Sequence, residues 1–150
     1  MENEIQKILS LLASTFEKNP WYGPSLKEVL SDIKPEQAFK KLEGTHTIIE
    51  IVAHMTAWRT FVIRKLEGDE HYSVEGHMNF PSVSDWSKVQ QDLFESQAKL
   101  ISALQNFPGT RLSEVVSHDS YRYTYYALLH GIIHHDVYHT GQISLIKKAA

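Results

Sequence analysis

The chain contains no cysteine, which excludes disulfides, cysteine-based zinc fingers and thiol nucleophiles. It has no apolar run near the roughly 20 residues that span a membrane. The N-terminal residues, Met1-Glu2-Asn3-Glu4, are acidic and lack the apolar core of a signal peptide. No basic cluster is present and the net charge is −3, so neither nucleic acid nor an anionic membrane is an expected partner. These absences predict a cytoplasmic protein in which histidines and carboxylates are the available metal ligands.

The remaining composition is that of an ordinary globular protein. Hydrophobic residues make up 42% of the chain and charged residues 22%. A length of 150 residues is enough to bury a sizeable core, and no internal repeat or low-complexity tract divides it. We therefore expect a single domain over residues 1–150.

Four stretches carry apolar residues at the i, i+3, i+4 spacing of amphipathic helices. They cover residues 2–18, 45–66, 84–106 and 124–147. The long connection between the first two predicts a short helix capped by Ser25 and a second one over residues 35–42. The pattern predicts an all-α fold, a four-helix bundle with a long first crossover.

Residues typical of helix N-termini mark several of these starts. Ser25 with Glu28, and Thr47 with Glu50, have the spacing of capping boxes. We also expect Ser84 or Asp85 to cap the third long helix, and Thr124 to cap the last one.

The last predicted helix carries four histidines in two pairs, His130 with His134 and His135 with His139. Residues four apart lie on the same side of a helix, so either pair could bind one metal ion. At about 100° per residue, His135 and His139 fall within an apolar stripe and the other pair falls outside it. That stripe contains Leu128, Ile132, Ile143 and Ile146. We expect His130 and His134 at a surface or subunit contact.

Two imidazoles in a core-facing stripe need partners, because an uncompensated buried polar group costs roughly 2–7 kcal/mol. Hydrogen-bonded core histidines are one solution, and a shared metal ion is the other. A third histidine, His54, lies in an apolar stripe of the second long helix with Trp58 and Phe61. Helix bundles build metal sites from side chains that project inward from facing helices. The three histidines together therefore favour a metal site.

Other polar residues near these histidines have open interpretations. Gln142 lies one turn beyond His139 on the same side, as a candidate for contact with a ligand or substrate or as a buried amide bonded to a neighbouring helix. Glu50 lies one turn before His54, where it could hydrogen-bond a ligand histidine or be solvated. Asp136 and Tyr138 are expected to face away from the histidine pair.

Some histidines and aromatic residues have simpler expected roles. His71 and His77 fall in a predicted loop over residues 67–83, where solvated side chains are expected. A tyrosine cluster is expected to line a pocket mouth or cover one end of the bundle; it comprises Tyr121, Tyr123, Tyr125 and Tyr126. The last helix also has a second apolar side, which predicts packing against another subunit in a homodimer or under the connecting loops. That side comprises Tyr126, Leu129, Ile133 and Val137.

Several motifs resemble the DinB/YfiT-like superfamily over the whole chain. One is His54-Met55-Thr56-Ala57-Trp58-Arg59, preceded by Ile49-Glu50-Ile51-Val52-Ala53. Another is Gly131-Ile132-Ile133-His134-His135-Asp136-Val137-Tyr138-His139-Thr140-Gly141-Gln142-Ile143, which is similar to the last-helix motif His-x-x-x-His-x-Gly-Gln-Ile. The turn Trp21-Tyr22-Gly23-Pro24 and Asp85-Trp86 are also similar to members. The resemblance implies a four-helix bundle, commonly dimeric, with a divalent metal held by His54, His135 and His139.

Three neutral imidazoles would leave a divalent ion its full charge and at least one open position, as in catalytic zinc sites. A bound water with a pKa near 7 or a bound thiolate would then be available. Ligand type allows zinc or nickel. The metalloprotease motif His-Glu-x-x-His is absent, since Asp136 follows His135.

The resemblance covers metal-dependent hydrolases, isomerases and transferases that use low-molecular-weight thiols. We expect a divalent-metal-dependent enzyme that hydrolyses a small molecule or transfers a thiol cosubstrate to it. The alternative is a non-catalytic metal-binding protein in a stress response or an interaction. A pocket open to solvent with a free coordination position favours the enzyme, whereas a sealed ion with a fourth protein ligand favours a structural role.

Overall fold

A computed structural model describes residues 3–117 and 122–150, in which the regular elements are helices apart from one isolated bridge between Val115 and Thr124. The all-α prediction is confirmed. The four long helices are α1 (Glu4–Phe16), α3 (Ile48–Leu66), α5 (Trp86–Asn106) and α6 (Tyr125–Ala149). Three short ones lie in the connections: α2 (Leu26–Leu30), α4 (Gly76–Asn79) and the 3₁₀ helix η1 (Gly109–Arg111). None of these helices is long and apolar enough to cross a membrane.

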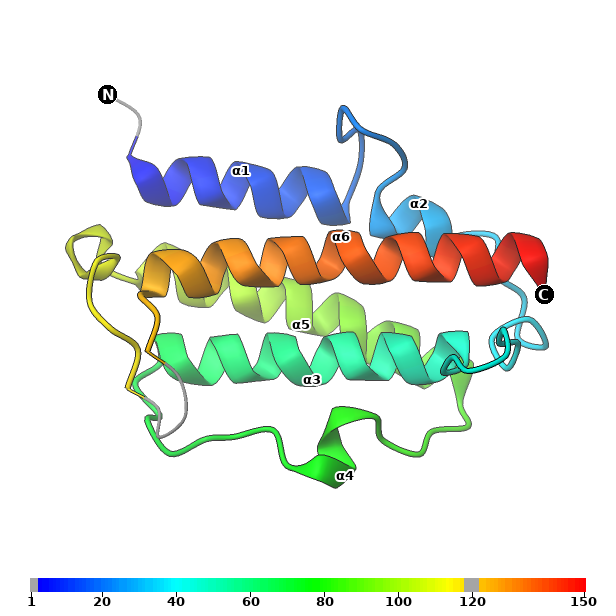
Figure 1. The fold of residues 1–150 in the computed structure, drawn as a ribbon. Helices are drawn as coiled ribbons and strands as arrows, with labels where there is room; N and C mark the ends of the chain where they lie inside the picture. The colour runs from blue at the N-terminus through cyan, green and yellow to red at the C-terminus, as the bar shows by residue number, and fades with distance from the viewer. Residues whose placement is uncertain (1–2, 118–121) are drawn as a thin grey trace.

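The long helices form a bundle in which α1 and α3 each pack against both α5 and α6. Helices α1 and α6 run in one direction and α3 and α5 in the other (Figure 1). The first connection, residues 17–47, is long as predicted and carries α2. The connection from α3 to α5 also crosses the molecule, because it must return along the bundle to start a parallel helix (Figure 1). This second crossover carries α4 past the side of α3.

The expected caps are present. Ser25 with Glu28 and Thr47 with Glu50 form complete capping boxes. Asp85 accepts a hydrogen bond from the Lys88 amide, and Thr124 accepts one from the Ala127 amide. These caps satisfy amides in the first turns that have no partner within the helix.

The boundaries of the long helices differ from the predicted ones by at most three residues, and one predicted short helix does not form. The first helix begins at Glu4, capped by Asn3, and ends at Phe16; residue 2 lies outside the described part. The predicted helix over residues 35–42 is wrong, since residues 35–39 form turns. The carbonyls of Ala38 and Lys40 accept the Ile49 and Ile48 amides at 2.9 and 3.2 Å. Those carbonyls therefore complete the start of α3 instead of a helix of their own.

The second apolar side of α6 is partly used within the chain. Leu129 and Ile133 are buried in the core between the long helices, whereas Tyr126 and Val137 are exposed. Of the residues that predict contact with a second subunit, only Tyr126 and Val137 therefore remain available on the surface.

A buried ion pair lies at the centre of a group of contacts that connects all four long helices. Arg59 and Asp136 are 0% and 1% exposed, and Arg59 Nη2 donates to Asp136 Oδ2. Arg59 Nη1 donates to Gln97 Oε1 at 2.6 Å, and the guanidinium lies 4.7 Å from the centroid of the Phe16 ring. Gln97 in turn donates to the Leu12 carbonyl at 3.4 Å. Burial raises the pKa of the Asp136 carboxyl, and the Arg59 guanidinium opposes that rise.

Candidate metal centre

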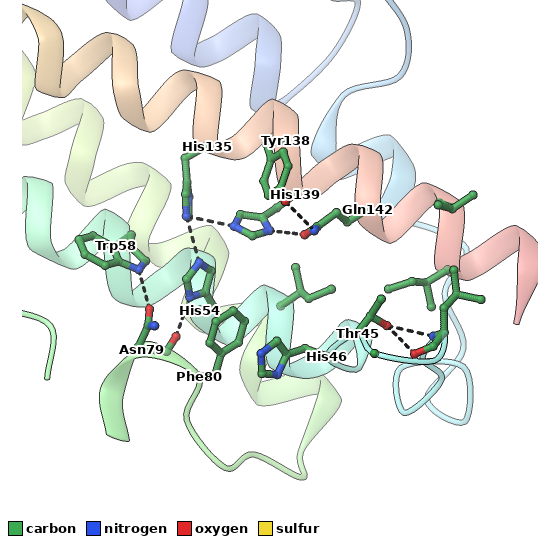
Figure 2. Close-up of a pocket in the computed structure, with 15 residues that line it drawn as sticks. Thr45, His46, His54, Trp58, Asn79, Phe80, His135, Tyr138, His139 and Gln142 are labelled. Carbon is green, nitrogen blue, oxygen red and sulfur yellow. Dashed lines mark hydrogen bonds between the residues drawn. The ribbon is translucent and has the colours of Figure 1, made fainter. Parts of the chain in front are cut away.

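The structure brings His54 from α3 together with His135 and His139 from α6 (Figure 2). The Nε2 atom of His135 lies 3.0 Å from Nε2 of His54 and 3.1 Å from Nε2 of His139. One nitrogen of each ring lies within 4.8 Å of those of the other two, a spacing that could hold a metal ion. Antiparallel packing of α3 and α6 creates this meeting of residues 81 positions apart.

Neighbouring oxygens fix where two of these rings carry their protons. The Asn79 backbone carbonyl lies 2.7 Å from His54 Nδ1, and Gln142 Oε1 lies 2.6 Å from His139 Nδ1. A carbonyl or amide oxygen only accepts a hydrogen bond, so each Nδ1 is the protonated nitrogen of a neutral ring. The Nε2 atoms of both rings therefore present lone pairs toward His135 (Figure 2).

Hydrogen bonding alone satisfies this trio poorly. A neutral His135 can place only one proton at its Nε2, and that proton faces lone pairs on both His54 and His139. A cation instead accepts lone pairs from all three nitrogens at once. The residues present therefore fit a metal ion. His135 Nδ1 is buried and has no hydrogen-bond partner in the described part of the chain.

Burial keeps the three rings neutral. It is the main cause that lowers the pKa of His135 to about 3, with further lowering by His139 and His54. Burial likewise lowers the pKa of His139 to about 4, against the hydrogen bond of Gln142, which raises it. The pKa of His54 is also lowered by burial. Metal ligation requires neutral imidazoles, and this site supplies them at neutral pH.

A cavity of about 720 Å³ opens from the three histidines. Its wall includes residues from α3, α6 and the connections before α3 and after α4. The Phe80 ring is stacked between two imidazoles. Its centroid lies 3.6 Å from that of His46 and 4.0 Å from that of His54, with 7° between the ring planes in each case. The group contains no fourth histidine or carboxylate in residues 3–117 and 122–150.

Sequence reasoning did not identify Asn79, Phe80 or His46 as neighbours of the site. Asn79 holds His54 through its carbonyl and Trp58 Nε1 through its side-chain Oδ1, at 2.9 Å. These residues lie outside the long helices, where no periodicity shows which way a side chain faces. The one signal was a large aromatic residue, Phe80, in a loop rich in polar residues and glycine.

The polar neighbours named from the sequence have different positions. Gln142 contacts His139 and donates to the Tyr138 hydroxyl at 3.1 Å. Tyr138 lines the cavity, so the expectation that it faces away is wrong. Asp136 does face away, toward Arg59. Glu50 does not contact a candidate ligand: its Oε2 accepts the Thr47 amide and hydroxyl, both at 2.8 Å.

The other histidines and tyrosines named from the sequence do not belong to the trio. His71 and His77 are exposed, as expected. The His130 ring contacts the Tyr126 ring, with their centroids 4.4 Å apart, and lies outside the candidate site, as does His134. Tyr125 is buried against Phe107, whereas Tyr123 lines a smaller pocket beside Trp58. Tyr121 lies outside the described residues.

Comparison with known proteins connects this geometry to a family. The family model of the DinB superfamily matches residues 24–143, a range that includes all three histidines and Gln142. No curated protein and no solved structure was found to match. The family match covers most of the chain, and the chain therefore belongs to the DinB superfamily.

Proposed function

We propose that this protein is a divalent-metal-dependent enzyme that acts on a small molecule, with His54, His135 and His139 as the metal ligands. The observation that carries the proposal is the convergence of three Nε2 atoms at the head of an open cavity. Two of those atoms present lone pairs because Asn79 and Gln142 hold the protons on Nδ1. Zinc or nickel suits three imidazole ligands.

The proposed reaction is hydrolysis or the transfer of a low-molecular-weight thiol cosubstrate. When bound, the ion would supply a Lewis acid that acidifies a water or a thiol. The protein would contribute orientation, since Asn79 and Gln142 fix the His54 and His139 rings. Gln142 also lines the cavity, within reach of a bound molecule. Phe80 stacks on the His54 ring and Trp58 packs edge-on against it, so apolar surface borders this candidate ligand.

The open cavity favours this proposal over a non-catalytic role in a stress response or an interaction. A structural metal site is closed by four protein ligands, and the trio has three. A substrate could therefore reach the open position through the cavity.

We also propose that the protein forms a homodimer through the outer face of α6. The support is an exposed apolar and aromatic strip that includes Tyr126 and Val137, with the His130 ring in contact with Tyr126. Light scattering at micromolar concentration tests this, with a dimer mass expected. A monomer mass would contradict it.

The enzymatic proposal is tested with tag-free protein prepared metal-free and then loaded with zinc or nickel. Each form is assayed with a panel of activated esters and amides, and with thiols plus an electrophile. We expect turnover only in a metal-loaded form and its loss in His135→Ala, while His134→Ala retains it. Metal binding without turnover of any of these classes would favour the non-catalytic role.

A further inference from the structure

We infer that the cavity takes a molecule with one metal-binding head group and an uncharged, elongated apolar body. This inference rests on the proposed function and names the substrate class of the same site. Three features support it: the absence of Lys, Arg, Asp and Glu from the wall, the occupied polar groups, and the direction in which the aliphatic wall extends.

The cavity wall carries no lysine, arginine or carboxylate side chain that would pair with a charged substrate. None of its lining residues is Lys, Arg, Asp or Glu, and three of its four histidines are the candidate metal ligands. An anionic or cationic group on the substrate body would therefore lose water without gaining an ion pair. A molecule whose body is uncharged avoids that cost.

The polar groups on the wall are largely occupied by the protein itself. Thr45 Oγ1 accepts the Leu42 amide at 3.0 Å and donates to the Leu42 carbonyl at 2.9 Å. The Asn79 side chain accepts from Trp58, and the Gln142 amide bonds His139 at one end and Tyr138 at the other. The wall therefore offers a ligand few free hydrogen-bonding groups and a larger share of apolar surface.

The aliphatic part of the wall extends from the histidines in one direction, whereas Trp58 lies one turn after His54 on the other side. Ile51 lies one turn before His54 on α3, and Ile146 lies two turns after His139 on α6. Because α3 and α6 are antiparallel, both steps lead toward the same end of the bundle. Seven residues of α6 span about 10 Å, the length of a chain of about eight carbons. Leu145, 59% exposed, and Leu42 also line this cavity.

The test uses straight-chain alkyl hydroxamates of two to twelve carbons, because a hydroxamate is a metal-binding head without a fixed body. Binding to the zinc-loaded protein is measured by calorimetry. We expect affinity to rise about two- to fourfold for each added methylene, up to about eight carbons, as apolar surface is buried. An eight-carbon hydroxamate with a carboxylate at its far end should bind at least tenfold more weakly than its neutral counterpart.

A variant pair locates the body of the ligand. Leu145→Lys places a cation on the exposed rim of the wall, and should narrow or reverse the tenfold preference for the neutral probe. Leu11→Lys is the matched control, since Leu11 is also exposed but lies on α1 outside the cavity. It should leave the preference unchanged. An unchanged preference in Leu145→Lys would overturn the placement of the ligand body along this wall.

The two-carbon probe separates failure of this inference from failure of the proposed function. If acetohydroxamate binds but affinity stays flat as the chain grows, the metal site stands and the apolar-body inference is overturned. Equal or tighter binding of the carboxylate probe would overturn it too. If the zinc-treated protein binds no hydroxamate of any length, the proposed function and this inference fall together.

Discussion

At the residue scale, the candidate site depends on where three imidazoles hold their protons. Asn79 and Gln142 hold the Nδ1 protons of His54 and His139, and burial keeps His135 and His139 neutral. The same burial makes the free energy of unfolding of the metal-free protein sensitive to acid. As the pH of the metal-free protein is lowered, these histidines are protonated at a higher pH in the unfolded chain than in the folded one.

Acid should therefore destabilise the metal-free protein in a defined window. The folded pKa values of about 3 for His135 and about 4 for His139 lie below the ordinary value of 6.5. Between pH 6.5 and 4 the unfolded state binds more protons, so the free energy of unfolding falls as the pH falls. The slope is at most about 1.4 kcal/mol per pH unit for each histidine, reduced by solvent screening.

Urea unfolding of the metal-free protein at pH 7, 6 and 5 measures this slope. His135→Leu should show a shallower slope than the wild type, whereas His134→Leu should match the wild type. The raised pKa of Asp136 acts in the opposite direction, so the difference between variants isolates the histidine. Identical slopes in the wild type and His135→Leu would contradict this account.

The trio was predictable because all three histidines follow the periodicity of long helices. Spacing placed His135 and His139 in one apolar stripe and His54 in another, and the structure brings those stripes together. Asn79 and Phe80 were not predictable in this way, because they lie in the connection between α3 and α5, where no long helical periodicity shows which way a side chain faces. Contacts of irregular segments depend on the tertiary path of the chain.

At the element scale, local sequence patterns predicted where helices start better than they predicted the path of the connections between helices. Both capping boxes were visible as a hydroxyl residue with Glu three positions later. The failed helix over residues 35–42 shows the limit of such patterns. Two of its carbonyls accept hydrogen bonds from amides in the first turn of α3, which lies outside the predicted helix.

The cap of α3 gives an element-scale prediction. Thr47→Ala removes the acceptor of the Glu50 amide and the donor to the Glu50 carboxylate. We expect a loss of about 1 kcal/mol in the free energy of unfolding, and a fall in Tm of about 2–4 °C for a chain of this size. Thermal unfolding followed by circular dichroism measures the shift.

Ser102→Ala is the control for this cap. Ser102 is exposed in the interior of α5, where loss of a hydroxyl should leave Tm unchanged or slightly raised. A Tm for Thr47→Ala equal to that of Ser102→Ala would show that the cap does not stabilise α3.

At the scale of the whole molecule, the ion pair of Arg59 and Asp136 links the core to the candidate site. Asp136 follows His135 directly, and its bond to Arg59 fixes which face of α6 turns toward the bundle core. The bundle was predictable from four apolar stripes. Arg59 was not identified, because an arginine at the centre of a bundle contradicts its usual exposure.

Removing one partner of this pair should cost more than removing both. Arg59→Met leaves the buried Asp136 carboxylate without its cation, and should lower the free energy of unfolding by about 3–5 kcal/mol. The double variant Arg59→Met with Asp136→Leu should recover much of that loss, because it buries no unpaired charge. Urea unfolding compares the two. A double variant no more stable than Arg59→Met would contradict this prediction.

Metal content is the most direct test of the central claim that His54, His135 and His139 form a metal centre. Elemental analysis is made on tag-free wild type, His139→Ala and His134→Ala after incubation with zinc or nickel and removal of free ion. We predict about one equivalent in the wild type and in His134→Ala, and loss of the metal in His139→Ala. Equal metal retention by the two variants, or no metal in the wild type, would contradict the claim.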